Sequence, residues 1–415
     1  MIHIKGNAIV GQSGGPTSVI NASLKGVIEE CLKNRDTVVR LFGAVNGIEG
    51  IFCEDLVDLY LEDRARIAEL KGTPGAALSG CRYRIQSDDV NDADNRRIFE
   101  VFEKYDIRYF FYIGGNDSMD TAMKIDSVAK KLGYDLTVIG VPKTIDNDLM
   151  ATDHCPGYGS CARYLITSVI ESGLHARSMR TAEPVTILIT VGRNAGWLPA
   201  ACSLARKQDS DPPHILCFPE VVFDRDSFAQ TVRDAYKKYG FVFIVTGEGI
   251  KDKSGQYISA EIDALSTDAF GHPTLGGVSE ALKQIVEHDT KLKARIIKLD
   301  ICQQAAAHLA SGVDLDEAEE CGRAAVRFAL LGDTGYMITI QRKSSAPYEI
   351  TYDKALFAKV ANLDRTVPPR FIGDDKISVT EEFTAYMAPL IENQVHAELK
   401  SSLKFYRGLQ MIHVK

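Results

Sequence analysis

Residues 8–32 read AIVGQSGGPTSVINASLKGVIEECL, which is an apolar run, a glycine-rich loop and a helical pattern in direct succession. The run Ala8-Ile9-Val10 predicts a short strand, and the apolar residues from Val19 to Leu32 recur at helix spacing. Such a junction points free backbone N–H groups and a helix N-terminus at one spot, which suits an anion such as phosphate. The loop is neither a G-x-x-x-x-G-K-[ST] motif nor a clean G-x-G-x-x-G fingerprint, so a plain tight turn is an equal alternative.

The same succession of strand, loop and helix continues through the first 150 residues. Apolar and aromatic runs predict strands at 37–42, 109–113 and 136–141, and residues 95–105 predict an amphipathic helix. Alternating strands and helices indicate a parallel, doubly wound α/β sheet, whose ligands gather at the carboxyl ends of the strands. The loops that follow these strands are therefore expected on one rim.

The loop after the strand 136–141 reads GVPKTIDND (140–148) and is the leading candidate for the chemistry. It places Lys143 beside two acids, Asp146 and Asp148, which are two residues apart and can point the same way in an extended loop. The alternative is an exposed polar loop after a strand. Only the other loops of the rim favour the catalytic interpretation.

Two further loops of this rim carry candidate side chains. Arg82 and Arg84 follow a small-residue loop and would share one side of an extended segment, as a phosphate clamp requires, although surface arginines are common. Asp117 follows two glycines and an asparagine at the entrance of a helix, where an aspartate often serves only as the cap.

A second α/β domain is predicted from strands at 185–191, 215–218 and 241–246. The first of these leads to Arg193, and the last leads to Glu248 between two glycines. A glutamate in this position could hydrogen-bond the hydroxyls of a sugar or close a backbone turn. The residues alone favour neither interpretation.

The composition excludes several classes of protein. With 415 residues the chain is long enough for two or three domains, and its net charge of −8 argues against a nucleic-acid partner. Its apolar runs are too short to span a membrane, so no membrane partner is expected either. Nine cysteines without a C-x-x-C pair, after an N-terminus that lacks a secretory pattern, indicate reduced thiols in a cytoplasmic protein.

Five motifs resemble, in order and spacing, those of the phosphofructokinase superfamily: Gly14-Gly15, GGNDS (114–118), PKTIDND (142–148), GRNAGW (192–197) and GEG (247–249). The resemblance covers nearly the whole chain. It implies an enzyme with small-molecule substrates and Mg²⁺. It also implies a homodimer or homotetramer, because sites in this family borrow residues from a neighbouring subunit.

The fold implied by the resemblance is a pair of doubly wound, Rossmann-like domains of the phosphofructokinase type. Residues 1–155 would bind the phosphoryl donor, with about 303–355 completing that domain. Residues 156–302 would bind the acceptor, with 356–415 completing that domain.

Two positions indicate the donor. ATP-dependent members of the family have glycine where Asp117 and Lys143 stand here, and pyrophosphate-dependent members have Asp and Lys. A carboxylate at position 117 would repel a nucleotide α-phosphate, and a lysine at 143 would neutralise charge on the pyrophosphate oxygens. Pyrophosphate is therefore the expected co-substrate.

By the same resemblance, Asp146 takes the proton of the acceptor hydroxyl, and Lys143, Asp148 and Asp117 complete the catalytic set. Asp148 with Asn116 or Asp117 would hold Mg²⁺. The expected donor-binding residues are Gly14, Gly15, Arg82, Asn116 and Ser118. The expected acceptor-binding residues are Thr144, Gly192, Arg193, Glu248, Arg295, Gln303 and Gln304.

The chain departs from the family where the 6-phosphate of fructose 6-phosphate is held. The usual Gln-Arg pair is Gln303-Gln304, the preceding His or Tyr is Ile301, and a usual Lys or Arg is Pro184. A phosphate dianion normally needs several cations. Either other cations compensate, or the acceptor carries no phosphate; the candidate cations are Arg180, Lys298, Arg342 and Lys343.

The first functional hypothesis is therefore reversible, glycolytic phosphoryl transfer from pyrophosphate to fructose 6-phosphate. The second keeps the donor and replaces the acceptor by an uncharged polyol, cyclitol or sugar. A non-catalytic regulatory subunit is disfavoured because Lys143, Asp146 and Asp148 are all present. A nicotinamide dehydrogenase is disfavoured because the dinucleotide fingerprint is absent.

Overall fold

The structure, a computed structural model, describes residues 4–260, 277–393 and 406–414 of the chain. The chain forms two compact units, each assembled from more than one segment. Unit 1 comprises Met1–Ser160, Gln304–Asp364 and Asn393–Lys415, and unit 2 comprises Cys161–Gln303 and Arg365–Glu392.

Unit 1 is built on one seven-stranded sheet. Its strands are β1 (Gly6–Gln12), β2 (Val38–Ala44), β3 (Leu56–Asp58), β4 (Ile107–Gly114), β5 (Thr137–Pro142), β10 (Tyr336–Ser345) and β11 (Tyr348–Leu356). They lie in the order β11-β10-β5-β4-β1-β2-β3, and the five inner strands run parallel. The edge strands β3 and β11 pair antiparallel with their neighbours. The predicted doubly wound α/β fold is confirmed.

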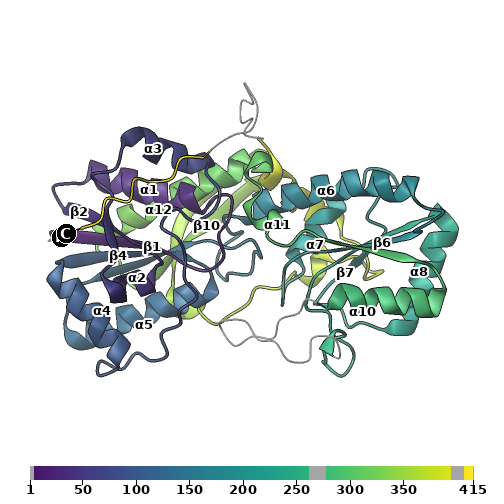
Figure 1. Cartoon of the computed structure of the whole chain (residues 1–415), viewed down its shortest axis with the longest axis horizontal. Coiled ribbons are helices and arrows are strands. Elements are labelled where there is room, and N and C mark those ends of the chain that lie inside the picture. The colour runs from purple at the N-terminus through teal and green to yellow at the C-terminus, as the bar shows by residue number, and fades with distance from the viewer. Residues whose placement is uncertain (1–3, 261–276, 394–405, 415) are drawn as a thin grey trace. The chain divides into compact units, whose positions relative to one another are not determined.

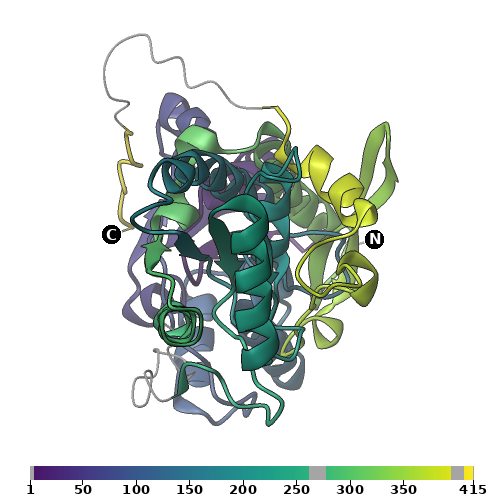
Figure 2. The same ribbon diagram turned by 90° about the vertical axis from the view of Figure 1, so that its right-hand side faces the viewer.

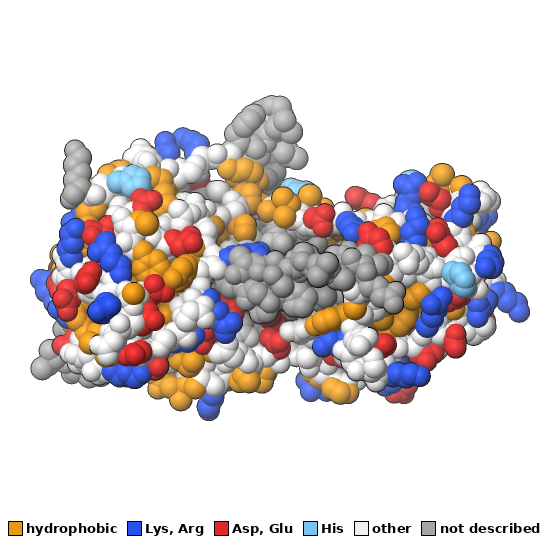
Figure 3. Space-filling model, turned by 60° about the horizontal axis from the view of Figure 1, so that its bottom comes forward, with side chains coloured by type: hydrophobic (Ala, Val, Ile, Leu, Met, Phe, Trp, Pro, Cys, Tyr) orange, Lys and Arg blue, Asp and Glu red, His pale blue; other side chains and the backbone are white. Residues whose placement is uncertain are grey.

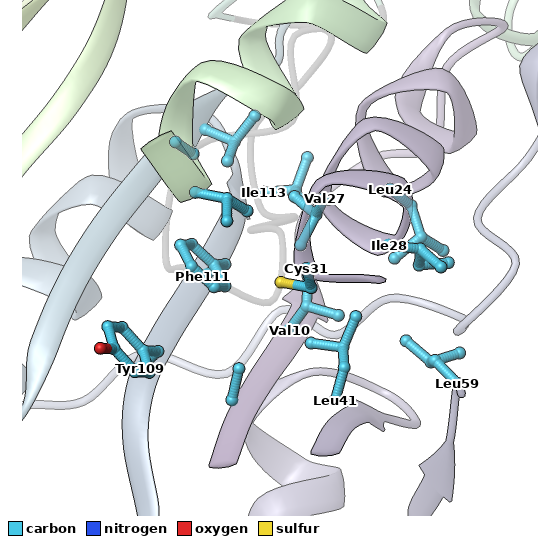
Figure 4. Packing of buried hydrophobic residues seen from close by; sticks show 14 of the residues in the cluster. Val10, Leu24, Val27, Ile28, Cys31, Leu41, Leu59, Tyr109, Phe111 and Ile113 are labelled. Atoms are coloured by element: carbon cyan, nitrogen blue, oxygen red, sulfur yellow. The ribbon is translucent and has the colours of Figure 1, made fainter. Parts of the chain in front are cut away.

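Helices cover both faces of this sheet (Figure 1). Their bounds are α1 (Ile20–Lys33), α2 (Ile48–Cys53), α3 (Arg64–Glu69), α4 (Ala93–Lys104), α5 (Asn116–Leu132) and α12 (Gly312–Leu330). Helices α1 and α12 lie on one face, and α4 and α5 lie on the other. Figure 4 shows Val27 and Cys31 of α1 packing toward Val10 and Phe111 of the sheet, and all four are fully buried. This core holds the strand ends that carry the site.

Unit 2 is built on a four-stranded parallel sheet in the order β7-β8-β6-β9. Its strands are β6 (Val185–Ile189), β7 (Ile215–Cys217), β8 (Val242–Thr246) and β9 (Ala294–Lys298). Its helices are α6 (Tyr158–Ser178, whose first turn belongs to unit 1), α7 (Trp197–Ala201), α8 (Arg225–Tyr239), α10 (Val278–Ile285), α11 (Cys302–Ala305, whose second half belongs to unit 1) and α13 (Glu381–Met387). Apolar side chains of α8 and α10 pack on the sheet, and Figure 2 brings α8 to the front.

Short helical turns complete the structure. They are η1 (Leu70–Gly72), η2 (Cys202–Ala205), η3 (Val286–Thr290), η4 (Ala307–Leu309), η5 (Phe357–Lys359), η6 (Pro369–Phe371) and η7 (Ala388–Ile391). In the described part of the chain, none of the helices combines the length and the apolar character needed to cross a membrane. Figure 3 shows basic and acidic side chains interspersed on the visible face.

The C-terminal segment differs from the expected domain boundary. We expected residues 356–415 to complete the second domain, but only Arg365–Glu392 joins unit 2. The last described residues lie along β3, where the N–H of Asp58 donates to the carbonyl of Ile412 (2.9 Å) and Leu409 is buried. The apolar residues of this tail, at 409, 411, 412 and 414, do not alternate cleanly with polar ones, so they carry no clear strand signal for this contact.

Candidate active site

The glycine loop after β1 is shaped by two close approaches. Gly14 has a φ of +74°, which disfavours any side chain, and a Cβ there would lie 3.3 Å from Nζ of Lys143. A Cβ on Gly15 would lie 3.1 Å from Oε1 of Gln304. Because the two glycines carry no side chain, the polar ends of Lys143 and Gln304 approach the backbone of the loop closely. An anion-binding loop needs the same uncovered backbone.

The entrance of α5 depends on another glycine. A Cβ on Gly114 would lie 2.0 Å from Oγ of Ser118, so only glycine fits at the end of β4. The carbonyl oxygen of Gly114 accepts a hydrogen bond from the N–H of Lys143 (3.0 Å). Ser118 is 4% exposed and packs against the end of β4, and its role in binding the donor stays a prediction.

Lys143 is a buried cation at the centre of the donor side. Its side chain is 4% exposed, and Nζ donates a 2.7 Å hydrogen bond to the carbonyl oxygen of Gly15. Burial lowers the pKa of Lys143 to about 8, and the charges of Asp146 and Asp148 offset part of that effect. An ammonium has three donors, and Gly15 takes one of them.

Asp146 and Asp148 lie in the loop that Lys143 begins, which we call the catalytic loop (residues 143–148). The N–H of Asp146 donates to Oγ1 of Thr144 (3.1 Å), which fixes the turn between them. Burial raises the pKa of Asp148 above its usual range, and the charges of Asp146 and Asp364 raise it further. Two carboxylates this close resist losing both protons, and a cation relieves that repulsion.

The side chain of Asn116 holds the segment 362–364. Its Nδ2 donates to the carbonyl of Leu363 (2.9 Å) and to Oδ1 of Asp364 (3.2 Å). Its Oδ1 accepts from the N–H of Asn362 (2.5 Å). Both ends of the amide are engaged, and the oxygen keeps a second lone pair, so the role of Asn116 as a metal ligand stays a prediction. Asp117, half-buried in the first turn of α5, is the better candidate.

The two arginines of the predicted phosphate clamp separate in the structure. Arg82 is exposed, and its charge acts on Lys143, lowering the pKa of that lysine. Arg84 instead contacts Oδ1 of Asn362 (3.4 Å) and lies 3.7 Å from Asp120. Of the two, Arg82 is the one whose charge acts on Lys143, and its contact with a phosphoryl group stays a prediction.

Asp117 and Asp148 are the residues that could hold Mg²⁺. Oδ1 of Asp148 is buried and accepts no hydrogen bond from the residues that the structure describes. The same described residues contain no group of three or more His, Cys, Asp or Glu side chains arranged around a metal position. That sparse set fits Mg²⁺, which typically takes one or two carboxylates together with substrate phosphates and water.

Two predicted acceptor loops meet at the carboxyl edge of the sheet of unit 2. The N–H of Glu248 donates to the carbonyl of Gly192 (3.1 Å). A Cβ on Gly249 would lie 1.5 Å from the carbonyl oxygen of Arg193, so the two backbones touch. The structure therefore brings together two loops that lie more than 50 positions apart in the sequence.

The two neighbouring glutamines divide between the units. Gln303 is 2% exposed, and its Oε1 accepts from the N–H of Val191 (3.1 Å) just beyond β6. Gln304 belongs to unit 1, where its Oε1 lies against Gly15. Gln303 thus braces a strand end and Gln304 faces the donor loop, and their role in binding the acceptor stays a prediction.

Arg295 lies away from the acceptor loops of its own unit. It pairs in register with Thr186, near the start of β6, and forms an ion pair with Glu183 (2.5 Å). Gly192 follows the other end of β6, about 20 Å away at the usual strand rise. A role for Arg295 across a subunit boundary stays a prediction.

Two residues at these strand ends were given no role from the sequence. Asn147, between the two acids, is fully buried with a φ of +57°, a conformation that asparagine tolerates better than most residues. Glu220 accepts from the N–H groups of Gly196 (2.9 Å) and Val367 (2.7 Å). Its position directly after an apolar strand was the available signal.

Comparison with known proteins gives consistent matches. The phosphofructokinase family profile matches residues 7–329. A protein of Halomonas elongata named pyrophosphate–fructose 6-phosphate 1-phosphotransferase is 43% identical over 389 residues, which cover 94% of this chain and 92% of that protein. The crystal structure of a pyrophosphate-dependent phosphofructokinase from Nitrosospira multiformis superposes with a TM-score of 0.89 at 38% identity, covering 99% of this chain and 98% of that one.

A further relative carries a different name. A sulfofructose kinase of Alkalicoccus urumqiensis is 31% identical over 368 residues, which cover 88% of this chain and 92% of that protein. Similar proteins are therefore named for two different acceptors.

Proposed function

Because the chain belongs to the phosphofructokinase family, we propose that it is a pyrophosphate-dependent phosphotransferase that converts fructose 6-phosphate to fructose 1,6-bisphosphate and releases phosphate. The observation that carries the donor assignment is the buried ammonium of Lys143, 2.7 Å from the carbonyl of Gly15. A fixed cation at the glycine loop neutralises part of the high negative charge of pyrophosphate. Asp117 repels the further phosphate that a nucleotide would bring.

The proton and charge of the reaction are assigned to the catalytic loop. Asp146 accepts the proton of the sugar hydroxyl as its oxygen bonds to the terminal phosphorus, and the bond from that phosphorus to the leaving phosphate breaks. Lys143 neutralises charge on the transferring oxygens, and Arg82 is placed to assist. Mg²⁺, held by Asp117 and Asp148, would supply further charge neutralisation.

The experiment that tests the donor uses purified protein with Mg²⁺, fructose 6-phosphate and either pyrophosphate or ATP, with release of phosphate or ADP as the readout. We expect turnover with pyrophosphate only, and we expect the reverse reaction from fructose 1,6-bisphosphate and phosphate. Turnover with ATP and none with pyrophosphate would refute the roles given to Asp117 and Lys143.

A second acceptor class is favoured by one observation. Two residues expected to face the 6-phosphate are neutral glutamines with other contacts, and Arg295 is ion-paired with Glu183. Acceptors without the phosphate, or with a sulfonate as the name of the relative suggests, therefore belong in the same assay. A lower KM for a neutral cyclitol, a neutral sugar or sulfofructose than for fructose 6-phosphate would replace the proposed acceptor while keeping the donor.

The proposed setting follows from the family. We expect a cytoplasmic homodimer or homotetramer whose acceptor site includes Arg295 of a neighbouring copy. Mass measurement of the native protein by light scattering tests this expectation, and a monomer that is fully active would contradict it.

A further inference from the structure

A buried histidine lies directly behind the catalytic loop. His154 is 1% exposed, and each of its ring nitrogens contacts a carboxylate. Nδ1 lies 2.8 Å from Oδ2 of Asp153, and Nε2 lies 2.6 Å from Oε2 of Glu317. A ring that donates to an acid from both nitrogens is a charged imidazolium.

The charges around this histidine balance. Arg342 forms an ion pair with Asp153 (2.9 Å), and the hydroxyl of Tyr348 donates to Oε1 of Glu317 (2.5 Å). The two cations, His154 and Arg342, thus face the two anions, Asp153 and Glu317. Burial lowers the pKa of His154, but the two carboxylates outweigh burial and raise it to about 9. The ring therefore stays charged at neutral pH.

The network ties the segment 152–155 to the scaffold from two sides. Glu317 belongs to α12, and Arg342 belongs to β10. On β10, Ile340 also exchanges backbone bonds with the segment, accepting from the N–H of Asp153 (2.8 Å) and donating to Oγ1 of Thr152 (2.9 Å). The segment is therefore fixed by helix and strand, whereas the catalytic loop ahead of it contains no helix or strand of its own.

The catalytic loop in turn is held by the segment that His154 fixes. The N–H of Cys155 donates to Oδ1 of Asn147 (2.9 Å), and the N–H of Thr144 donates to the carbonyl of Pro156 (3.2 Å). Asn147 separates Asp146 from Asp148, so its side chain sets where both acids point. A shift at Cys155 must move Asn147 or break a buried hydrogen bond, and either change disturbs the backbone between the two acids.

We propose that His154 is a positioning residue for the phosphotransferase, holding Asp146 and Asp148 in register through Cys155 and Asn147. This proposal rests on the proposed function above. The imidazolium is one bridge between α12 and the segment 152–155, because Glu317 reaches that segment through His154. Asp314 of α12 forms a second link just beyond the segment, where it accepts from the N–H groups of Gly157 (2.9 Å) and Ser160 (2.8 Å). The other titratable groups that interact with Glu317 are Cys321, Tyr348 and Tyr352.

The variant His154→Gln tests the proposal, because glutamine can keep one hydrogen bond and cannot carry the charge. Its control is Glu62→Gln. Like His154, Glu62 is a buried titratable group of unit 1 (3% exposed), but it accepts from the N–H groups of Gln410 and Met411, and among the described residues it makes no hydrogen bond with the catalytic loop. Melting temperatures of both variants show whether their losses of stability match.

With pyrophosphate and the acceptor identified in the assay above, we expect kcat of His154→Gln to fall about 10–100-fold at pH 7, the cost typical of misplaced catalytic groups, with KM for pyrophosphate little changed. Glu62→Gln should keep kcat within about 2-fold. The pair His154→Gln and Asn147→Ala should be strongly non-additive in kcat, since both break the same link. Additive losses, or an unchanged kcat in His154→Gln, would overturn the proposal.

A readout without turnover separates this inference from the proposed function. Hydrogen exchange of the peptide 144–157, measured by mass spectrometry, should be faster in His154→Gln than in the parent, and unchanged in Glu62→Gln. If the parent has no phosphotransferase activity but the exchange result holds, the proposed function fails and the positioning contact stands. Equal exchange in all three proteins would overturn the contact itself.

Discussion

The ammonium of Lys143 lies 2.7 Å from the carbonyl oxygen of Gly15, so one hydrogen bond joins the catalytic loop to the donor loop. The bond connects the end of β5 to the end of β1, two strands separated in the sheet by β4. A cation placed in this way needs no rearrangement when charge develops on the donor. Such preorganised charge often supplies most of the rate enhancement in phosphoryl transfer.

Replacing this lysine by methionine, which has similar length and no charge, tests its electrostatic role. We expect kcat/KM for pyrophosphate to fall by about 10²–10³-fold, as when one preorganised donor is removed. The stability of Lys143→Met should change little, since relief from burying the charge offsets the loss of its hydrogen bond to Gly15 and of its attraction to the two acids. Lys130→Met, at an exposed lysine of α5 that pairs with the buried Asp126, is the control and should leave kcat/KM unchanged. A loss within about 3-fold in Lys143→Met would remove Lys143 from the mechanism.

The contact between Gly114 and Ser118 predicts a second result. Gly114→Ala places a Cβ 2.0 Å from Oγ of Ser118, so the first turn of α5 must shift. We expect a loss of about 1–3 kcal/mol in stability, as for other overpacked sites, together with a loss of activity because Asp117 moves with that turn. Ser118→Gly removes the two clashing atoms, so the double variant should recover activity although Ser118→Gly alone is slightly destabilised. A double variant as inactive as Gly114→Ala would show that the clash is not the cause.

The sequence predicted the inner strands and the loops after them because apolar runs and glycines carry strong local signals. It could not predict which side chain of a loop faces inward. Gln303 and Gln304 are neighbours in the sequence, yet one braces β6 and the other faces Gly15. Arg82 and Arg84 separate in the same way. The direction of each of these side chains is set by contacts between segments that are distant in the sequence. A single sequence shows no pattern for such contacts.

The tail offers a third prediction. Glu62 is 3% exposed, and its carboxylate accepts from the N–H groups of Gln410 and Met411 (2.9 and 2.7 Å). Deleting residues 406–415 leaves this acid buried without those donors and exposes the site of Leu409. We expect the free energy of unfolding of unit 1, followed by urea denaturation, to fall by about 2–4 kcal/mol.

Substituting a single exposed tail residue controls for changes at the surface. His413 is an exposed side chain paired with Asp55, and surface pairs contribute about 0–1 kcal/mol. His413→Ala should therefore change little. If the deletion were as harmless as His413→Ala, the tail would not be part of the core of unit 1.

The packing of α12 on α1 predicts a pH dependence. Glu319 is 8% exposed and forms ion pairs with Lys25 (2.6 Å) and Lys71 (2.9 Å). Burial raises the pKa of Glu319, but hydrogen bonds from Lys25 and Lys71 outweigh burial and lower it from 4.5 to about 2. A folded pKa below the unfolded value stabilises the protein above pH 4.5, and this contribution is lost as the pH falls toward 2.

Glu319→Gln removes that contribution while keeping the shape of the side chain. We expect the variant to be less stable than the parent by about 3–4 kcal/mol at pH 7, since the pKa is lowered from 4.5 to about 2 and each pKa unit corresponds to about 1.4 kcal/mol. Urea denaturation at a series of pH values should show the difference shrinking between pH 4.5 and 2, because the parent glutamic acid becomes neutral there. Glu320→Gln removes a more exposed ion pair, that between Glu320 and Arg327. Its stability should differ only a little from that of the parent at every pH. A difference that stays constant across the pH range would mean that the glutamate acts through packing, and its ion pairs would then contribute nothing to the contact between the helices.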